Sequence, residues 1–318
     1  MFSIHKKNEN GFDKIVLEDE LFGTFAEIVP SCGAILHAFT TKKEGREYNV
    51  IDSYTSADDF KKNVTSGGFK GCKLSPFVCR INKGKYHFAG KDYTIEKYYD
   101  RNNALHGEIY DASFTIVEEL SDAVQAMVSM KYVYEGTDPG YPFLYECIIT
   151  YQLEKENLLN VITKVINKDS GQIPIQDGWH PYFKLDAKID DLELQFQSKE
   201  MVEFDSELIP TGKLLPYTEF NNSKKFGDTF FDNCFTLDPE KGQPMCIVKN
   251  NEENFQVEIH PDRSYPYLQF YTPSHRNSIA IENISGAPDA FNNGMGFAIL
   301  DPGQSATFKT SYKLTLLT

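Results

Sequence analysis

The chain has 318 residues, 41% hydrophobic and 25% charged, as in ordinary soluble globular proteins. Its formal net charge of −14 argues against binding to nucleic acid or to anionic membranes, since both attract clustered Lys and Arg. No apolar stretch approaches the length of a membrane span, and the N-terminus lacks the apolar core of a secretion signal. The six cysteines show no Cys-x-x-Cys spacing, which favours free thiols in a reducing cytoplasm.

In chain order, the sequence predicts many strands and one short helix. The helix covers residues 56–63, with Ser56 as its N-cap and two aspartates in its first turn. Residues 158–166 are apolar and β-branched, which predicts a strand buried on both faces. Polar and apolar residues alternate over 191–197, over 254–260 and near the C-terminus, which predicts strands with one buried face.

Turn-forming residues separate these strands, at 82–84, 89–92, 138–140 and 301–303. No linker, low-complexity segment or fixed repeat interrupts the sequence. We therefore predict one antiparallel β domain over residues 1–318, too large for a seven-stranded sandwich.

Two histidines and a carboxylate lie at the ends of apolar runs. His106 ends Asn-Ala-Leu-His, His180 lies in Gly-Trp-His-Pro-Tyr-Phe, and Glu282 ends Ser-Ile-Ala-Ile-Glu. Imidazole titrates near neutral pH, so the three suggest proton transfer. A buried histidine bonded to a carbonyl, or a structural ion pair of Glu282, would be a purely structural alternative.

Three further residues are candidates for binding a ligand. Trp179, the only tryptophan, offers a flat ring for stacking beside His180. Arg80 precedes a turn and could bind hydroxyls or a carboxylate, and Asp232 lies among phenylalanines. Rings mixed with carboxylates are typical of carbohydrate pockets. A surface arginine and a turn-capping aspartate are the structural alternatives.

The sequence predicts neither a metal site nor a cofactor. It contains no His-x-His or His-Glu-x-x-His string. It also lacks a Gly-x-Ser-x-Gly elbow, a phosphate loop and a dinucleotide glycine fingerprint.

Taken in order, these motifs resemble those of the aldose 1-epimerase (mutarotase) family along nearly the whole chain. The similarity runs from Ala-Glu-Ile-Val-Pro-Ser-Cys-Gly-Ala through the segments of Arg80, His106 and His180 to the closing Leu-Asp-Pro-Gly-Gln. Two residues depart from the best-studied galactose branch of the family. Cys79 stands where that branch usually has Asn, and Asn283 where it usually has Pro, which leaves the preferred sugar open.

The resemblance implies a large, twisted antiparallel β-sandwich of the galactose mutarotase-like (supersandwich) kind, with few short helices. It also implies a cytoplasmic isomerase of carbohydrate metabolism that interconverts the α and β anomers of a free aldose without cofactor or metal. The expected partner is a small monosaccharide, and the expected assembly is a monomer or a weak homodimer.

The resemblance also implies roles for five of the six candidates. Glu282 takes the proton of the C1 hydroxyl while His180 protonates the ring oxygen. His106 and Arg80 hold the sugar, and Asp232 bonds its hydroxyls. An ionised Glu282 is expected to raise the pKa of His180 by favouring the imidazolium.

Three alternatives stay open. One is an epimerase of hexose 6-phosphates, for which Lys70, Lys73 and Lys83 are candidate phosphate ligands. The second is a non-catalytic carbohydrate-binding domain on the same fold. The third is a lyase or hydrolase on a related sandwich, which would need another catalytic carboxylate or tyrosine.

Overall fold

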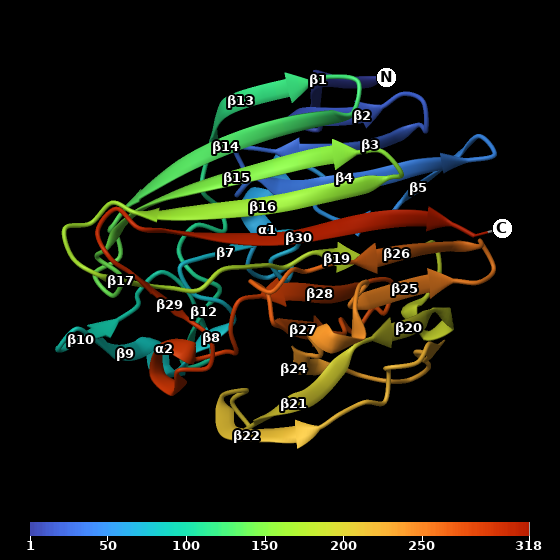
Figure 1. Ribbon diagram of the computed structural model, residues 1–318. Coiled ribbons are helices and arrows are strands. Elements are labelled where there is room, and N and C mark those ends of the chain that lie inside the picture. Colours follow the sequence, from blue (N-terminus) through green and yellow to red (C-terminus); the bar gives the residue numbers. More distant parts are fainter. Residues whose placement is uncertain (318) are drawn as a thin grey trace.

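The structure, a computed structural model, describes residues 1–317 and consists mostly of antiparallel strands (Figure 1). Strands make up 52% and helices 6%, which confirms the predicted all-β class. Thr318, the last residue of the predicted domain, lies outside the described residues. Within residues 1–317, no helix combines the length and the apolar character that crossing a membrane requires.

One nine-stranded sheet forms the long upper layer in Figure 1. Alternation builds it: along β15, every second residue is buried, so one face packs inward and the other meets solvent. The alternations predicted over 191–197 and 254–260 both fall in this sheet and are confirmed. In spatial order its strands are β13 (Thr115–Ser121), β14 (Gln125–Glu135), β15 (Leu144–Glu154), β16 (Leu158–Asn167), β30 (Ser305–Leu316), β26 (Phe255–Ile259), β25 (Cys246–Asn250), β20 (Glu193–Phe196) and β23 (Lys224–Lys225).

A second sheet extends below the long strands of the first in Figure 1. Its central strand β28 is buried at every residue, as its apolar sequence predicts. The strands in order are β22 (Pro210–Pro216), β21 (Ser198–Phe204), β24 (Asp232–Leu237), β27 (Tyr267–Tyr271), β28 (Ile279–Ile284), β18 (Gly178–Trp179) and β7 (Lys73–Leu74), with β19 (Tyr182–Phe183) joining β28 to β6 (Ile51–Asp52).

The inner faces of these two sheets pack against each other. Asn283 of β28 donates to the Tyr312 hydroxyl of β30 at 3.3 Å, and the ring of Phe183 meets that of Tyr312 at 5.4 Å. A single large cluster of buried apolar side chains includes residues of both sheets. This packing confirms the predicted β-sandwich.

The remaining elements are smaller. The chain opens with an antiparallel five-stranded sheet, and short sheets and helices carry the loops. These elements are β1 (Phe2–Glu9), β2 (Phe12–Asp19), β3 (Thr24–Val29), β4 (Ile35–Lys43) and β5 (Arg46–Asn49); β8 (Arg80–Ile81), β11 (Tyr99–Asp100) and β12 (Asn103–Leu105); β9 (Lys85–Phe88) and β10 (Lys91–Thr94); β17 (Ile173–Ile175) and β29 (Ala298–Leu300); and the helices α1 (Ala57–Asn63), α2 (Ala290–Asn293), η1 (Asn82–Gly84), η2 (Ile189–Asp191) and η3 (Pro239–Lys241).

The structure confirms two of the local predictions and contradicts a third. The helix is confirmed: α1 follows Ser56, whose hydroxyl accepts from the Asp59 backbone N–H at 3.0 Å. All six cysteines are free and buried, as predicted. The prediction that residues 158–166 are buried on both faces is wrong, because Lys164 of β16 is exposed and Ile162 is only half-buried. The outer face of that sheet is open to solvent there.

A buried carboxyl beside the His106 loop predicts a pH effect on stability. Burial, and then Asp138, raises the pKa of Glu108 from 4.5 to about 8. Protonation therefore favours the folded state, so this stabilisation is full below pH 4.5 and is lost as pH rises through 8. We expect Glu108→Gln to flatten the fall of Tm between pH 6 and 9, raising Tm at pH 9 by about 2 °C or more. Thermal melts should show no such gain for Glu118→Gln, an exposed control on β13.

Candidate active site

One cavity of about 380 Å³ gathers five of the six predicted site residues. Arg80 comes from β8, His106 from the residue after β12, and His180 from the link between β18 and β19. Asp232 begins β24, and Glu282 lies in β28. Residues as far apart in the chain as Arg80 and Glu282 thus meet at one site.

Strand register brings the carboxylates to the cavity. Cross-strand partners share a face of a sheet. Glu282 is paired with Gln269 of β27, and Asp232 is paired with Tyr271 of the same strand. Because 269 and 271 have the same parity, all four side chains lie on one face, and all four line the cavity.

Main-chain hydrogen bonds fix both histidines. His106 donates its backbone N–H to the Cys79 carbonyl at 2.8 Å, and His180 donates to the Cys72 carbonyl at 3.0 Å. His106 has a φ of +64° and is followed by Gly107, where a Cβ would collide with the Ser75 carbonyl oxygen. The Leu-His-Gly string is therefore a tight turn that only glycine can complete.

His180 and Glu282 form a direct, buried pair. His180 Nε2 lies 3.3 Å from Glu282 Oε1, and their side chains are 6% and 3% exposed. The His180 ring stacks on Tyr182 at 5.2 Å and meets His106 edge-on at 5.0 Å. Packing on both sides holds the imidazole in place, so a proton can pass between fixed partners.

Burial shifts these two groups in opposite directions. It raises the pKa of Glu282 well above its ordinary value, helped by Asp232 and opposed by Arg80. Burial also lowers the pKa of His180 to about 3 and that of His106 well below its ordinary value. The prediction that Glu282 raises the pKa of His180 is wrong, because the loss of hydration on burial dominates.

The rest of the cavity wall is polar. Arg80 Nη2 contacts Asp100 Oδ2 at 3.2 Å, and Gln269 Nε2 donates to Asp232 Oδ1 at 3.0 Å. Within the described residues, His106 Nδ1, His180 Nδ1 and Gln269 Oε1 have no hydrogen-bond partner. Buried polar atoms are normally bonded, so these three lack the partners that such atoms usually have.

Trp179 does not line this cavity. It is cross-strand partner to Asn283 and faces the interior, 5.9 Å from the Tyr151 ring and beneath the Lys73 ammonium at 4.5 Å. The predicted stacking of Trp179 on a ligand is therefore wrong. Neighbours along an extended chain point to opposite faces, so the residue beside His180 turns into the core.

We expect Trp179→Phe to lower stability while sparing activity. The smaller ring leaves a void beside Tyr151, costing about 1–3 kcal/mol of unfolding free energy. Denaturant unfolding followed by circular dichroism measures that loss. Activity per folded molecule should fall less than about tenfold. Phe196→Leu, a core change on β20, is the matched control, and a larger activity loss for Trp179→Phe alone would return this residue to the site.

The three candidate phosphate lysines do not converge on the cavity. Lys73 is buried in the core, paired with Asp177. Lys83 is absent from the cavity lining, and Lys70 lines the adjoining hollow, where its ammonium lies 2.9 Å from Asp52.

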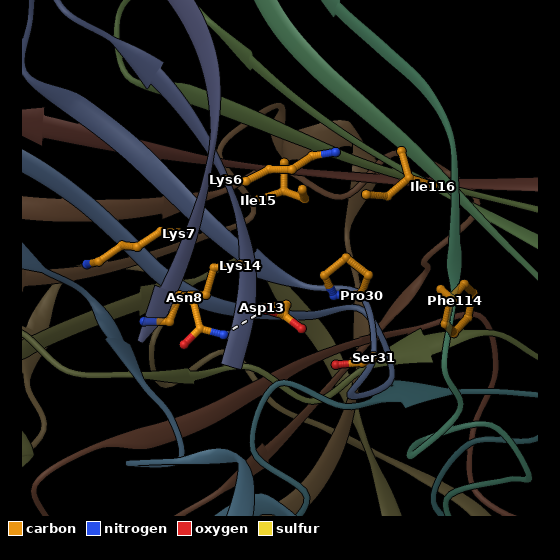
Figure 2. Close-up of a pocket in the computed structure, with 10 residues that line it drawn as sticks. All are labelled: Lys6, Lys7, Asn8, Asp13, Lys14, Ile15, Pro30, Ser31, Phe114 and Ile116. Carbon is orange, nitrogen blue, oxygen red and sulfur yellow. Dashed lines mark hydrogen bonds between the residues drawn. The ribbon is translucent and has the colours of Figure 1, made fainter. Parts of the chain in front are cut away.

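A larger hollow of about 500 Å³ lies elsewhere, beside the N-terminal sheet (Figure 2). Its lysines include Lys14, whose ammonium is held at 2.7 Å by both Glu9 and Glu27. Its one lining carboxylate, Asp13, accepts from Asn8 at 2.7 Å. The lining residues include no histidine, so this hollow offers no pair for proton transfer.

Among residues 1–317, no three or more His, Cys, Asp or Glu side chains gather so as to hold a metal ion. A reaction without metal stays a prediction.

Sequence reasoning missed several lining residues, notably Cys79, Gln269 and Tyr271. Gln269 carried a usable signal, since it is the one polar non-aromatic residue in Tyr-Leu-Gln-Phe-Tyr. A buried amide needs partners, as a buried carboxylate does. Cys79 and Tyr271 carried no such signal, because their place depends on the loop and on strand register.

Fold and site together define a galactose mutarotase-like β-sandwich. A solved galactose mutarotase-like protein from Clostridium acetobutylicum matches with a TM-score of 0.88 at 18% identity, covering 99% of each chain. The sequence matches the aldose 1-epimerase family over residues 13–313. The chain belongs to the aldose 1-epimerase family, and it is an isomerase.

Two relatives illustrate the family's range. An aldose 1-epimerase from Streptococcus thermophilus is 27% identical, covering 88% of each chain. A maltose epimerase from Levilactobacillus brevis is 23% identical, covering 97% of this chain and 96% of its own.

Proposed function

We propose that this protein interconverts the α and β anomers of a free aldose by acid–base catalysed ring opening and closure. The observation that carries the proposal is the buried contact of 3.3 Å between His180 Nε2 and Glu282 Oε1 at one cavity. A non-catalytic sugar-binding domain would have no need of such a pair, since burying two ionisable groups together costs free energy.

The mechanism requires that the pair carry one proton. Burial favours the uncharged forms, in which that proton lies on Glu282. Transfer to His180 gives the carboxylate and imidazolium, and the Arg80 guanidinium favours this carboxylate. Glu282 then takes the proton of the C1 hydroxyl, His180 gives one to the ring oxygen, and the bond between C1 and that oxygen breaks.

Ring closure reverses these transfers. The open-chain aldehyde rotates about its C1–C2 bond, and the ring hydroxyl attacks the other face of C1. His180 recovers the proton of that hydroxyl, and Glu282 returns one to the oxygen on C1. His106 and Arg80 hold the sugar near the ring oxygen, and Asp232 accepts from its hydroxyls. No atom is gained or lost, and the enzyme returns to its starting protonation state.

The charges of the site favour an uncharged aldose over a 6-phosphate. The cavity lining includes two guanidinium groups and three carboxyl groups, and the guanidinium of Arg80 is already paired with Asp100. A phosphate dianion normally needs several unpaired basic groups.

A polarimetric panel tests this proposal. Freshly dissolved single anomers of glucose, galactose, xylose and arabinose should reach equilibrium faster in proportion to enzyme concentration. Glucose 6-phosphate should give a kcat/KM at least about tenfold lower than glucose. A preference for the phosphate would favour the alternative epimerase, and spontaneous rates on every sugar would refute the proposal.

A second candidate substrate is a reducing disaccharide. A hollow of about 460 Å³ adjoins the cavity and shares Gly68, Tyr182 and Tyr271 with it, so a second ring has space beside the first. The relative named maltose epimerase supports including this class. Adding maltose and lactose to the panel tests it: comparable kcat/KM for maltose and glucose supports the candidate, and a maltose value near zero rejects it.

A further inference from the structure

The carboxyl of Glu282 has a second partner besides His180. Cys79 Sγ lies 3.9 Å from Glu282 Oε2, within the reach of a hydrogen bond to sulfur, while His180 contacts the other oxygen. Cys79 is 3% exposed and lines the same cavity. Burial raises the pKa of this thiol well above its ordinary value, so it keeps its proton and donates it to the carboxyl.

The backbone at Cys79 is unusual as well. Its φ is +47°, in the left-handed region that residues other than glycine and asparagine rarely adopt. Its carbonyl accepts the His106 backbone N–H at 2.8 Å, and Arg80 follows it directly. One residue thus connects the loop of His106, the guanidinium of Arg80 and the carboxyl of Glu282.

We propose that Cys79 is a positioning residue whose thiol orients the Glu282 carboxyl and, as a weak donor, leaves that carboxyl readily protonated. The proposal rests on the proposed acid–base role of Glu282. A thiol is a much weaker donor than a hydroxyl or an amide, and a strong donor at this place would favour the carboxylate. The donor strength of the side chain at position 79 therefore determines how readily the His180–Glu282 pair keeps its one proton.

The other groups facing Glu282 are known, so the effect of position 79 can be isolated. Asp232 raises the pKa of Glu282 and Arg80 lowers it, while the uncharged Gln269 lies opposite on β27. The remaining titratable neighbours are His180, Tyr182 and Cys234. Substitutions at Cys79 leave all of these unchanged.

The test is the pH dependence of kcat/KM in three variants. Cys79→Ser and Cys79→Asn introduce stronger donors, and Asn tolerates the left-handed backbone. Both should move the alkaline limb to lower pH, by about one unit. Cys79→Ala removes the donor and should move that limb to higher pH while lowering kcat severalfold, because the carboxyl is less well oriented. Cys246→Ser, a buried thiol on β25, is the control.

The pH values of the alkaline limbs in the wild type and the three Cys79 variants decide the outcome. If all three variants keep the wild-type profile, whatever their stability, Cys79 has only a structural role and the proposal is overturned. A second measurement needs no substitution at Cys79 and no sugar. The infrared S–H stretch of the wild type should contain one band displaced to lower frequency, which Glu282→Gln shifts, since an amide and a protonated carboxyl differ in acceptor strength.

Identical S–H bands in the wild type and in Glu282→Gln would show that the Cys79 thiol does not bond to the Glu282 carboxyl. The infrared result does not depend on enzymatic activity. If the wild type fails to anomerise any sugar, the proposed function fails, yet the displaced band still tests the thiol–carboxyl contact.

Discussion

Glu282→Gln should lower kcat for anomerisation by about a hundredfold or more, because a positioned acid or base contributes about 10²–10⁴ to the rate. The amide has the shape of the carboxyl but cannot carry the shared proton. Sugar binding should survive in part, since the amide still forms hydrogen bonds. Polarimetry on a single anomer gives kcat, and the change in KM or a direct titration gives binding.

The chain offers a matched control for this substitution. Glu258 of β26 lies 3.1 Å from His260, which follows the end of that strand, and neither residue lines the cavity. Glu258→Gln removes a carboxyl beside a histidine outside the cavity and should leave kcat near the wild-type value. Full activity in a folded Glu282→Gln variant would remove Glu282 from the mechanism.

His180→Asn should cause a loss of similar size, also about a hundredfold or more in kcat. Asparagine fits the space and keeps a donor, but it cannot pass a proton to the ring oxygen. His260→Asn is the matched control, since it breaks the other histidine–glutamate pair. Equal small losses in both histidine variants would show that His180 serves only the fold.

A double variant that combines Glu282→Gln with His180→Asn tests whether the two residues act as one unit. Residues that act as one unit lose most of the rate when either is removed. The double variant should therefore be little slower than either single variant. Fully multiplicative losses would mean that the two groups act independently, contrary to a shared proton.

The shifted pKa values also set the expected pH profile. The acid limb comes from a second proton on the pair, taken at His180, whose pKa is lowered to about 3. The alkaline limb comes from loss of the pair's last proton, which the raised pKa of Glu282 moves above the ordinary carboxyl range. The pH profile should thus be bell-shaped, with both limbs belonging to the pair rather than to one residue.

Part of the site could be predicted from the positions of its residues relative to apolar runs in the sequence. His106, His180 and Glu282 stand out in sequence because each is polar at the end of an apolar run. The order of the motifs that contain these residues then indicated the family, and the family indicated the fold. The contact between His180 and Glu282 was expected from the resemblance alone, because no local pattern fixes which strands are neighbours.

The wrong and the missed predictions have a common physical cause. Trp179 and His180 adjoin in sequence, yet the pleat sends one into the core and the other to the cavity. The pKa of His180 depends on its burial, to which His106 contributes from a distant segment of the chain. Cys79 contacts Glu282 from a loop in which its own backbone is left-handed. Each outcome depends on tertiary packing that spacing in the sequence does not encode.

Some expectations remain untested by the fold. The single-domain boundary at 1–318, the cytoplasmic location and the monomeric or weakly dimeric state all stay predictions. Gel filtration with light scattering would measure the assembly directly.

The most direct test of the central claim is exchange NMR on a neutral aldose at anomeric equilibrium. The account predicts cross-peaks between the α and β H1 signals that grow with wild-type enzyme, with the equilibrium ratio of the anomers unchanged. Such exchange reports interconversion itself, without net conversion or a coupled assay. If no aldose in the panel, phosphorylated or neutral, shows enzyme-dependent exchange, the buried His180–Glu282 pair does not catalyse anomerisation.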